Sequence, residues 1–367
     1  MRRLIDCPGS AQLVAAIAAL RSQGLQADRY CFSGWAPRDR FAAFSAEVAR
    51  MATQLQPGLT GSAIAPERFT SWLGRSLSAL EQQQLRQEIG LETVDELWLA
   101  TGWRPKEQLL RQLYPTARCL CYGDGLGVYV AADSVLQQRR GWRSRLRSWW
   151  SPATKPLPAD GGHFIFSGDR QPPFPSQPVP LSDLEDCLHT LANALPTQAI
   201  ASLRQLTAQR EWGVLLTANL SEQADGAYIS LTAEIEAYRQ FLADQSLPSA
   251  LLLKPHPRDS ATKLQQLTTA IADLGVEPLV LQDSQLAFWP IEVILLSLLP
   301  DLQGLPVFTV SSAAVPLQAL GADVQLGFGA AIVRRQFTRK GQRLRRHEEQ
   351  QLQRWLQVGN GASNPRL

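Results

Sequence analysis

Residues 3–22 read RLIDCPGSAQLVAAIAALRS, and this stretch indicates the fold class of the chain. Its apolar start, Leu4–Cys7, predicts a buried strand, Pro8-Gly9 predicts a turn, and the remainder predicts a helix to about residue 22. The same order recurs downstream, with strands predicted at residues 29–33, 96–101 and 119–122. Strands that alternate with helices are typical of a parallel α/β sheet, because parallel neighbours need a long crossover connection.

A second series of strands and helices follows residue 181, with strands predicted at residues 213–218, 250–253, 278–281 and 307–310. The 367 residues suffice for two domains, since domains typically have about 100–200 residues. We expect an α/β protein with Rossmann-like domains at residues 1–170 and 182–335, and a basic helix and tail at 336–367. The first domain is expected to carry an excursion at residues 134–181, first basic and tryptophan-rich and then rich in proline, interrupted by one short strand at 163–167.

Composition excludes several classes of protein. The 45% hydrophobic content excludes a disordered chain, and five scattered cysteines without a CxxC pair argue against a disulfide framework or a zinc ribbon. The most apolar stretch, 288–299, contains Pro290 and Glu292 and is shorter than the ~20 residues that span a bilayer. The N-terminus lacks a signal-peptide cleavage site, so we expect a cytoplasmic protein.

Three turns after predicted strands carry residues suited to chemistry, because ligands of open α/β sheets bind at the carboxyl ends of the strands. The first turn is Gly123-Asp124-Gly125. Its two glycines leave the carboxylate of Asp124 unshielded by neighbouring side chains. A functional carboxylate and an ordinary Asp-Gly turn both remain open.

The second turn is Lys254-Pro255-His256-Pro257-Arg258, directly after an apolar strand. Two prolines fix the backbone around one imidazole, and a cation lies on either side of it. This pattern suits phosphate binding or proton donation, while a stiff surface loop is the alternative.

The third turn is Thr309-Val310-Ser311-Ser312, where hydroxyls follow a strand and a helix is predicted to begin. Hydroxyls and a helix N-terminus together favour an anion, although an ordinary serine cap would look the same. No D-x-D, HExxH or GxSxG motif occurs, so metal-dependent transfer and hydrolase chemistry have little support.

In that order, Gly123-Asp124-Gly125, Lys254-Pro255-His256-Pro257 and Ser311-Ser312 resemble the motif set of bacterial sialyltransferases and polysialyltransferases. Pro290-Ile291-Glu292 resembles a Pro-x-Glu element of that family, and the turn that ends in Gln12 is a weaker match to its N-terminal Pro-x-x-Gln turn. One departure is Gly123, because the family usually has a second acid there.

The resemblance implies a GT-B fold, in which two Rossmann-like domains, the first for the acceptor and the second for the donor, face each other across a cleft. It implies an inverting transfer of sialic acid from CMP-sialic acid, with no metal and no cofactor besides the donor. Asp124 would be the base, and His256 would bind or protonate the departing phosphate. Further donor-site residues would be Lys254, Pro257, Glu292, Ser311 and Ser312, and acceptor-side residues would be Gln12, Gly123 and Gly125.

Two segments hold 12 of the 36 basic residues and no acid, namely Arg139–Trp150 and Arg334–Arg346. The rest of the chain therefore carries 3 − 12 = −9 of the net charge of +3. Such segments are either solvated loops or contacts with an anionic membrane surface or glycan, which would put the protein at the inner face of the cytoplasmic membrane. Nothing in the three turns requires nucleic acid, and we expect none as partner.

Alternative functions remain open from the sequence. The donor could be another CMP-activated ulosonic acid, of the Kdo or legionaminic type. The chain could also be a catalytically silent GT-B-like protein that binds glycans, or an epimerase of UDP-sugars on the same architecture. The residues do not distinguish the donor sugar, the acceptor, or single transfer from polymerisation.

Overall fold

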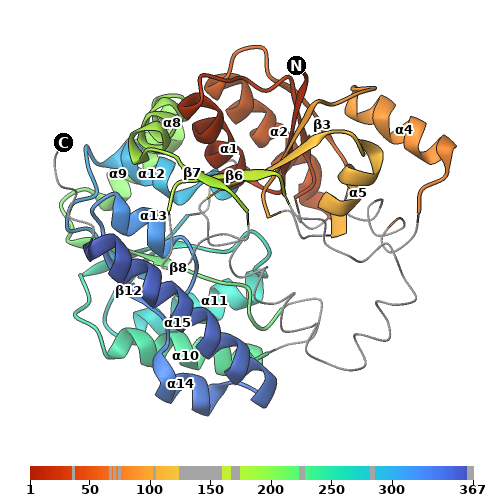
Figure 1. Ribbon diagram of the computed structural model, residues 1–367. Coiled ribbons are helices and arrows are strands. Elements are labelled where there is room, and N and C mark those ends of the chain that lie inside the picture. Colours follow the sequence, from red (N-terminus) through yellow and green to blue (C-terminus); the bar gives the residue numbers. More distant parts are fainter. Residues whose placement is uncertain are drawn as a thin grey trace. The chain divides into compact units, whose positions relative to one another are not determined.

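The computed structural model describes residues 1–34, 38–65, 68, 72, 76–101, 105–123, 159–166, 174–222, 228–281 and 286–361. The chain divides into two compact units, Met1–Ala194 and Leu195–Leu367. Each unit is built around one sheet, and all strand pairs described in both sheets are parallel (Figure 1). The predicted parallel α/β class is therefore confirmed.

The first unit has a sheet in the order β3-β2-β1-β4-β5-β6-β7. Its strands are β1 (Arg3–Cys7), β2 (Arg29–Phe32), β3 (Thr60–Ala63), β4 (Glu96–Leu99), β5 (Arg118–Gly123), β6 (Gly161–Phe164) and β7 (Ser176–Pro178). Its helices are α1 (Ser10–Ser22), α2 (Arg38–Leu55), α4 (Ala79–Ile89), α5 (Pro105–Leu113) and α8 (Leu181–Asn193). The order of β3 to β6 is that of a Rossmann-like sheet, with its switch point between β1 and β4.

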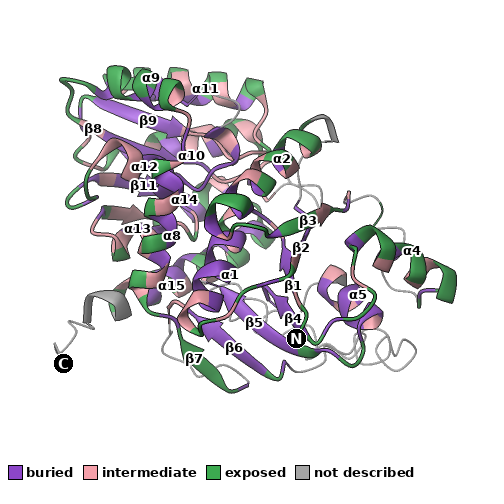
Figure 2. Cartoon of the chain, turned by 90° about the horizontal axis from the view of Figure 1, so that it is seen from above, coloured by how far each residue is buried: buried purple, intermediate pink, exposed green. Residues whose placement is uncertain are grey.

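Helix α1 explains how this unit is packed. Its residues Leu13–Leu20 are all buried, because the helix contacts β1 and β5 of the sheet and is covered by α2 and α8. A helix that is apolar all round is stable only when it is enclosed in this way. Figure 2 shows that the central strands of this sheet are buried, whereas the outer surface of α4 is exposed.

Two predictions about the domain boundary differ from the structure. The proline-rich stretch was expected to be an excursion with one short strand at residues 163–167, but it contains two strands, β6 and β7, which extend the first sheet in parallel to β5. Helix α8 was expected in the second domain from residue 182, but it packs on α1 and α2 and belongs to the first unit. The apolar surface of α1 needs this cover, and the boundary therefore falls after Ala194.

The second unit has a sheet in the order β10-β9-β8-β11-β12. Its strands are β8 (Trp212–Leu216), β9 (Ala250–Lys254), β10 (Glu277–Val280), β11 (Pro306–Thr309) and β12 (Asp323–Leu326). Its helices are α9 (Thr197–Thr207), α10 (Leu231–Ala243), α11 (Ala261–Ala272), α12 (Ile291–Leu298), α13 (Ala314–Ala319), α14 (Gly329–Gln336) and α15 (Arg339–Gly361), with a short 3-10 turn, η2 (Leu286–Phe288). The order reverses between β8 and β11, which is where a Rossmann-like sheet binds its ligand.

Candidate functional site

Three adjacent strands of the second sheet end in polar loops. The loop after β9 carries His256, the loop after β8 begins at Thr217, and the turn after β11 carries Ser311 and Ser312. Because β9, β8 and β11 are neighbours and parallel, these loops share one edge of the sheet. Two of the three loops were predicted from the sequence, and the loop after β8 was missed.

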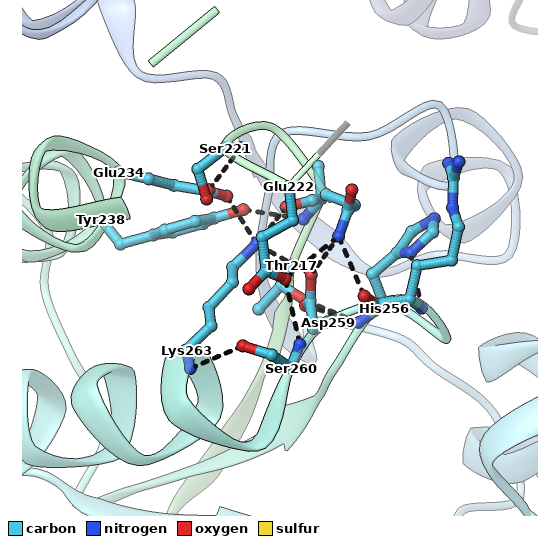
Figure 3. Close-up of polar contacts among 12 residues, drawn as sticks. Thr217, Ser221, Glu222, Glu234, Tyr238, His256, Asp259, Ser260 and Lys263 are labelled. Carbon is cyan, nitrogen blue, oxygen red and sulfur yellow. Dashed lines mark hydrogen bonds and ion pairs between the residues drawn. The ribbon is translucent and has the colours of Figure 1, made fainter. Parts of the chain in front are cut away.

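The turn around His256 is held by backbone hydrogen bonds (Figure 3). The backbone N–H of His256 donates to Oγ1 of Thr217 at 2.7 Å and to Oδ2 of Asp259 at 2.9 Å. The backbone N–H of Asp259 in turn donates a hydrogen bond to the carbonyl oxygen of His256 at 2.8 Å. Thr217 also donates its hydroxyl to Asp259 at 2.6 Å, so the loop after β8 and the loop after β9 form one unit.

The imidazole of His256 has a defined tautomer. The backbone N–H of Arg258 donates to Nδ1 of His256 at 3.1 Å, so Nδ1 is an acceptor and the neutral ring carries its hydrogen on Nε2. Burial and, to a smaller extent, the Arg258 guanidinium lower the pKa of His256 to about 4, against the opposing effect of the Asp259 carboxylate. The ring is therefore neutral at pH 7 and offers one N–H donor.

Lys263 forms hydrogen bonds with both loops, the one after β8 and the one after β9. Its Nζ donates to Oε1 of Glu234 at 2.6 Å, to Oδ1 of Asp259 at 2.8 Å and to the carbonyl oxygen of Ala218 at 2.7 Å (Figure 3). The other oxygen of Glu234 accepts from the backbone N–H of Ser221 at 2.8 Å. Lys263 is 1% exposed and Glu234 is 0% exposed, so this is an ion cluster inside the protein.

The sequence analysis missed this cluster, although one signal was present. Lys263 lies in the first turn of α11, where the helix dipole disfavours a cation and favours an acid. A lysine at such a position is explained when buried carboxylates surround it. The partner Glu234 is 29 residues away in the chain, and no local pattern connects the two.

Lys254 and Glu292 lie near the same edge of the sheet. Nζ of Lys254 approaches the carbonyl oxygen of Ala287 at 3.4 Å, and Glu292 is buried in the first turn of α12. Burial lowers the pKa of Lys254 to about 8, and the negative charge of Glu292 opposes that shift. Pro257, half-buried, follows His256 in the turn. The structure thus brings Lys254, His256 and Glu292 to one edge of the sheet.

The serine turn differs from its prediction. The helix was expected to begin at Ser312, but α13 begins at Ala314 and has six residues, too few for an effective dipole at its N-terminus. Oγ of Ser311 lies 3.1 Å from Oγ1 of Thr309, whose oxygen also accepts from the N–H of Ser311. Ser312 is exposed. Hydroxyl groups, and not a helix dipole, are what this turn offers to an anion.

In the first unit, Gly123 ends β5 and Gln12 lies in the first turn of α1, both at the carboxyl edge of the sheet. Gly123 has φ of 138°, a conformation that residues with a side chain rarely adopt. This backbone conformation explains why a glycine stands at position 123. Asp124 and Gly125 lie outside the described residues.

A buried polar group near that edge was also missed by the sequence analysis. Asp6 is 0% exposed and accepts from Oγ of Ser33 at 3.1 Å. Nζ of Lys106 donates to the same Oγ at 2.8 Å. Asp6 lies inside the apolar run that predicted β1, so its charge gave no separate signal.

The second basic segment, Arg334–Arg346, spans the end of α14 and the start of α15. Six of its seven cations are exposed. The exception is Arg345, whose Nε donates to Oε1 of Glu349 at 2.8 Å, while Glu349 accepts from backbone N–H groups at the start of α14. The first basic segment, Arg139–Trp150, lies outside the described residues.

Within the part of the chain that the structure describes, histidines, cysteines and acids form no cluster suited to a metal ion. No helix among the same residues combines the length and apolar character needed to cross a membrane.

The fold and the polar edge define the class as an α/β protein of two Rossmann-like units with a polar site at a strand-order switch point. No family model matches the chain, and no curated protein matches it. Among solved structures it is similar to the N-terminal domain of trehalose-6-phosphate phosphatase from Candida albicans, over 98% of this chain and 93% of that one. The sequence identity is 9% and the TM-score is 0.39, which carries no argument about activity.

Proposed function

We propose that the protein is an inverting, metal-independent glycosyltransferase that transfers sialic acid from CMP-sialic acid to a glycan or glycolipid acceptor. The observation that carries this proposal is the grouping of Lys254, His256 and the Ser311-Ser312 turn at adjacent strand ends of the second sheet. An ammonium, a neutral N–H donor and two hydroxyls suit one phosphate group.

The reaction forms one bond and breaks one. The oxygen of the acceptor hydroxyl bonds to the anomeric carbon, and the bond from that carbon to the phosphate oxygen breaks, so its electron pair leaves with CMP. The proton of the acceptor hydroxyl goes to Asp124, by resemblance. Two Rossmann-like domains that close on each other, as in a GT-B fold, would position the two substrates.

The state of His256 favours binding of the phosphate over its protonation. Nδ1 already accepts from the Arg258 N–H, and the pKa of the imidazole is lowered to about 4, so the ring has no spare proton at pH 7. Its Nε2–H donates a hydrogen bond to the developing phosphate charge. Glu292 would accept hydrogen bonds from the ribose hydroxyls of the same nucleotide.

A thermal-shift comparison of CMP, UDP and GDP with their sugars tests the donor. CMP compounds should stabilise the protein most, by about 2.7 kcal/mol at 100 times the Kd. His256→Ala should abolish the shift, whereas His189→Ala, an exposed histidine on α8, should keep it. Preferential stabilisation by UDP would overturn the donor assignment.

Transfer assays test the roles of the two catalytic candidates. Asp124→Ala should lower the rate of transfer about 10²–10⁴-fold, the usual contribution of acid–base catalysis. His256→Ala should cost a comparable factor through the lost hydrogen bond to phosphate. Near-native transfer in either variant would refute the assigned role.

The exposed cations of α14 and α15 support a second part of the proposal, contact with anionic lipid headgroups. Each Lys or Arg near such a surface contributes about 1 kcal/mol. Arg339, Arg343 and Arg346 line one shallow depression on α15, so they can approach a surface together. A glycolipid acceptor would be met at that surface.

A further inference from the structure

The first unit contains a cavity at the amino ends of its strands, away from the carboxyl edge of the sheet. It has a volume of about 370 Å³, within the range of roughly 300–1,000 Å³ typical of small-molecule sites. Its walls include the first residues of β4, β5, β6 and β7 and the segment after α1. Gly123 and Gln12 are at the opposite edge of the same sheet.

Two neighbouring glycines of β6 line this cavity, and one of them leaves room for it. Gly161 is in register with Leu120 of the neighbouring strand, and a Cβ at Gly161 would lie 3.3 Å from Cδ2 of Leu120. A Cβ at Gly162 would lie 2.6 Å from the ring of Phe164. Gly162 is therefore required for packing, whereas a side chain at Gly161 would occupy the cavity.

Two stacked rings form part of the wall. The indole of Trp98 and the imidazole of His163 have centroids 5.0 Å apart and an interplanar angle of 19°. Trp98 is fully buried and His163 is 9% exposed, and both residues line the cavity. Among the described residues, neither Nε1 of Trp98 nor Nδ1 of His163 has a hydrogen-bond partner. Burial lowers the pKa of His163, which keeps the imidazole neutral and able both to donate and to accept.

Charged groups of both signs surround the rings. Glu96 is paired with Arg3 at 2.7 Å and with Arg118 at 3.6 Å, and Oδ2 of Asp160 accepts from the N–H of Cys119 at 2.7 Å. The cavity wall thus carries two carboxylates and one guanidinium, Arg118, which remains largely exposed. Counting Arg3, the partner of Glu96, two guanidinium groups balance the two carboxylates around the cavity. A site without net charge favours a neutral ligand over an ion, and its donors and acceptors suit hydroxyl groups.

We propose that this cavity binds a neutral sugar ring, and that it is a carbohydrate site separate from the carboxyl edge of the sheet. The apolar C–H face of the sugar packs on the His163 ring, and its hydroxyls bond to the carboxylates of Glu96 and Asp160 and to the guanidinium of Arg118. The proposal holds whatever the donor nucleotide is. If the proposed transfer is correct, the site would hold a neutral residue of the glycan acceptor.

Histidine NMR of the full chain tests the site, because the chain has only four histidines. D-galactose and D-glucose at tens of millimolar are the probes, followed by N-acetylneuraminic acid and CMP. A neutral hexose should shift the imidazole signals of His163 and leave those of His256 in place. CMP should do the reverse, so a failure of the donor assignment is seen separately from a failure of the sugar site.

Variants distinguish binding in the cavity from a general effect. Gly161→Val should abolish the sugar-induced shift by filling the space. Arg118→Ala, at an exposed position that folding should tolerate, should weaken it several-fold, and Arg210→Ala, an arginine of the second unit, should not. Unchanged His163 signals with both hexoses, an equal shift in Gly161→Val, or a stronger shift with N-acetylneuraminic acid would overturn the proposal.

Discussion

Replacing Lys263 by methionine should strongly destabilise the second unit. Lys263 is 1% exposed, and its ammonium group lies 2.6 Å from Glu234 and 2.8 Å from Asp259, both buried. Methionine fills most of the space of the lysine stem but leaves two carboxylates without their cation. Removing one partner of a buried ion pair costs about 3–5 kcal/mol, and the two carboxylates together place the expected loss near the upper end.

Urea unfolding of the full chain measures this loss, and hydrogen exchange assigns it to the strands of the second unit. Lys340→Met is the matched control, because Lys340 is exposed on α15 over the ring of Tyr228 and should cost less than about 1 kcal/mol. The double variant Lys263→Met/Glu234→Gln should be more stable than Lys263→Met alone, since it removes one of the uncompensated charges.

Two results would refute this reasoning. One is a loss below about 1 kcal/mol for Lys263→Met, which is the range of an exposed ion pair. The other is a double variant whose loss of stability equals the sum of the losses of Lys263→Met and Glu234→Gln measured alone. Additive effects would mean that Lys263 and Glu234 do not stabilise each other.

Three further predictions concern pH, backbone conformation and membranes. The pKa of His256 is about 4 in the folded protein, below its unfolded value, so the free energy of unfolding should fall as pH drops from about 6.5 towards 4. Urea unfolding at each pH should show a smaller fall in His256→Gln. Gly123→Ala should cost about 1–3 kcal/mol in the same assay, because φ is 138°. Arg339→Glu/Arg343→Glu/Arg346→Glu should weaken sedimentation with phosphatidylglycerol vesicles.

The predictions on pH and on membranes each have a matched control. For the pH dependence, His189→Gln should leave the acid loss unchanged, since His189 is exposed. For the vesicles, the same charge change at Arg204, Arg210 and Arg239 should leave sedimentation intact. Equal loss of sedimentation in both triple variants would mean that net charge, and not the surface of α15, governs the contact.

The sequence predicted apolar strands well, including β10 at an edge of its sheet, and predicted polar edge strands poorly. Strands β1 and β9 were placed within a residue because their apolar runs are buried on both faces of a parallel sheet. Strands β3 and β12 were missed, since they lie at the edges of their sheets, are partly exposed and lack an apolar run. The short β7, with its exposed residues, was hidden in a proline-rich stretch for the same reason.

The site was predicted where its chemistry is local. His256 between two prolines and the paired serines are visible in a few residues of sequence. The contact of Thr217 with Asp259 spans 42 residues, and that of Lys263 with Glu234 spans 29. Such pairs form only when the crossover connections bring separate loops to one edge of the sheet, so no local sequence pattern predicts them.

The enclosure of α1 has a practical consequence for dividing this protein into fragments. A fragment that stops at residue 170 would lack α8 and would open the apolar side of α1 to water. Copies of such a fragment would associate through that surface. A fragment of residues 1–194 keeps the helix covered, and it is the piece in which the proposed carbohydrate site of the first unit could be studied alone.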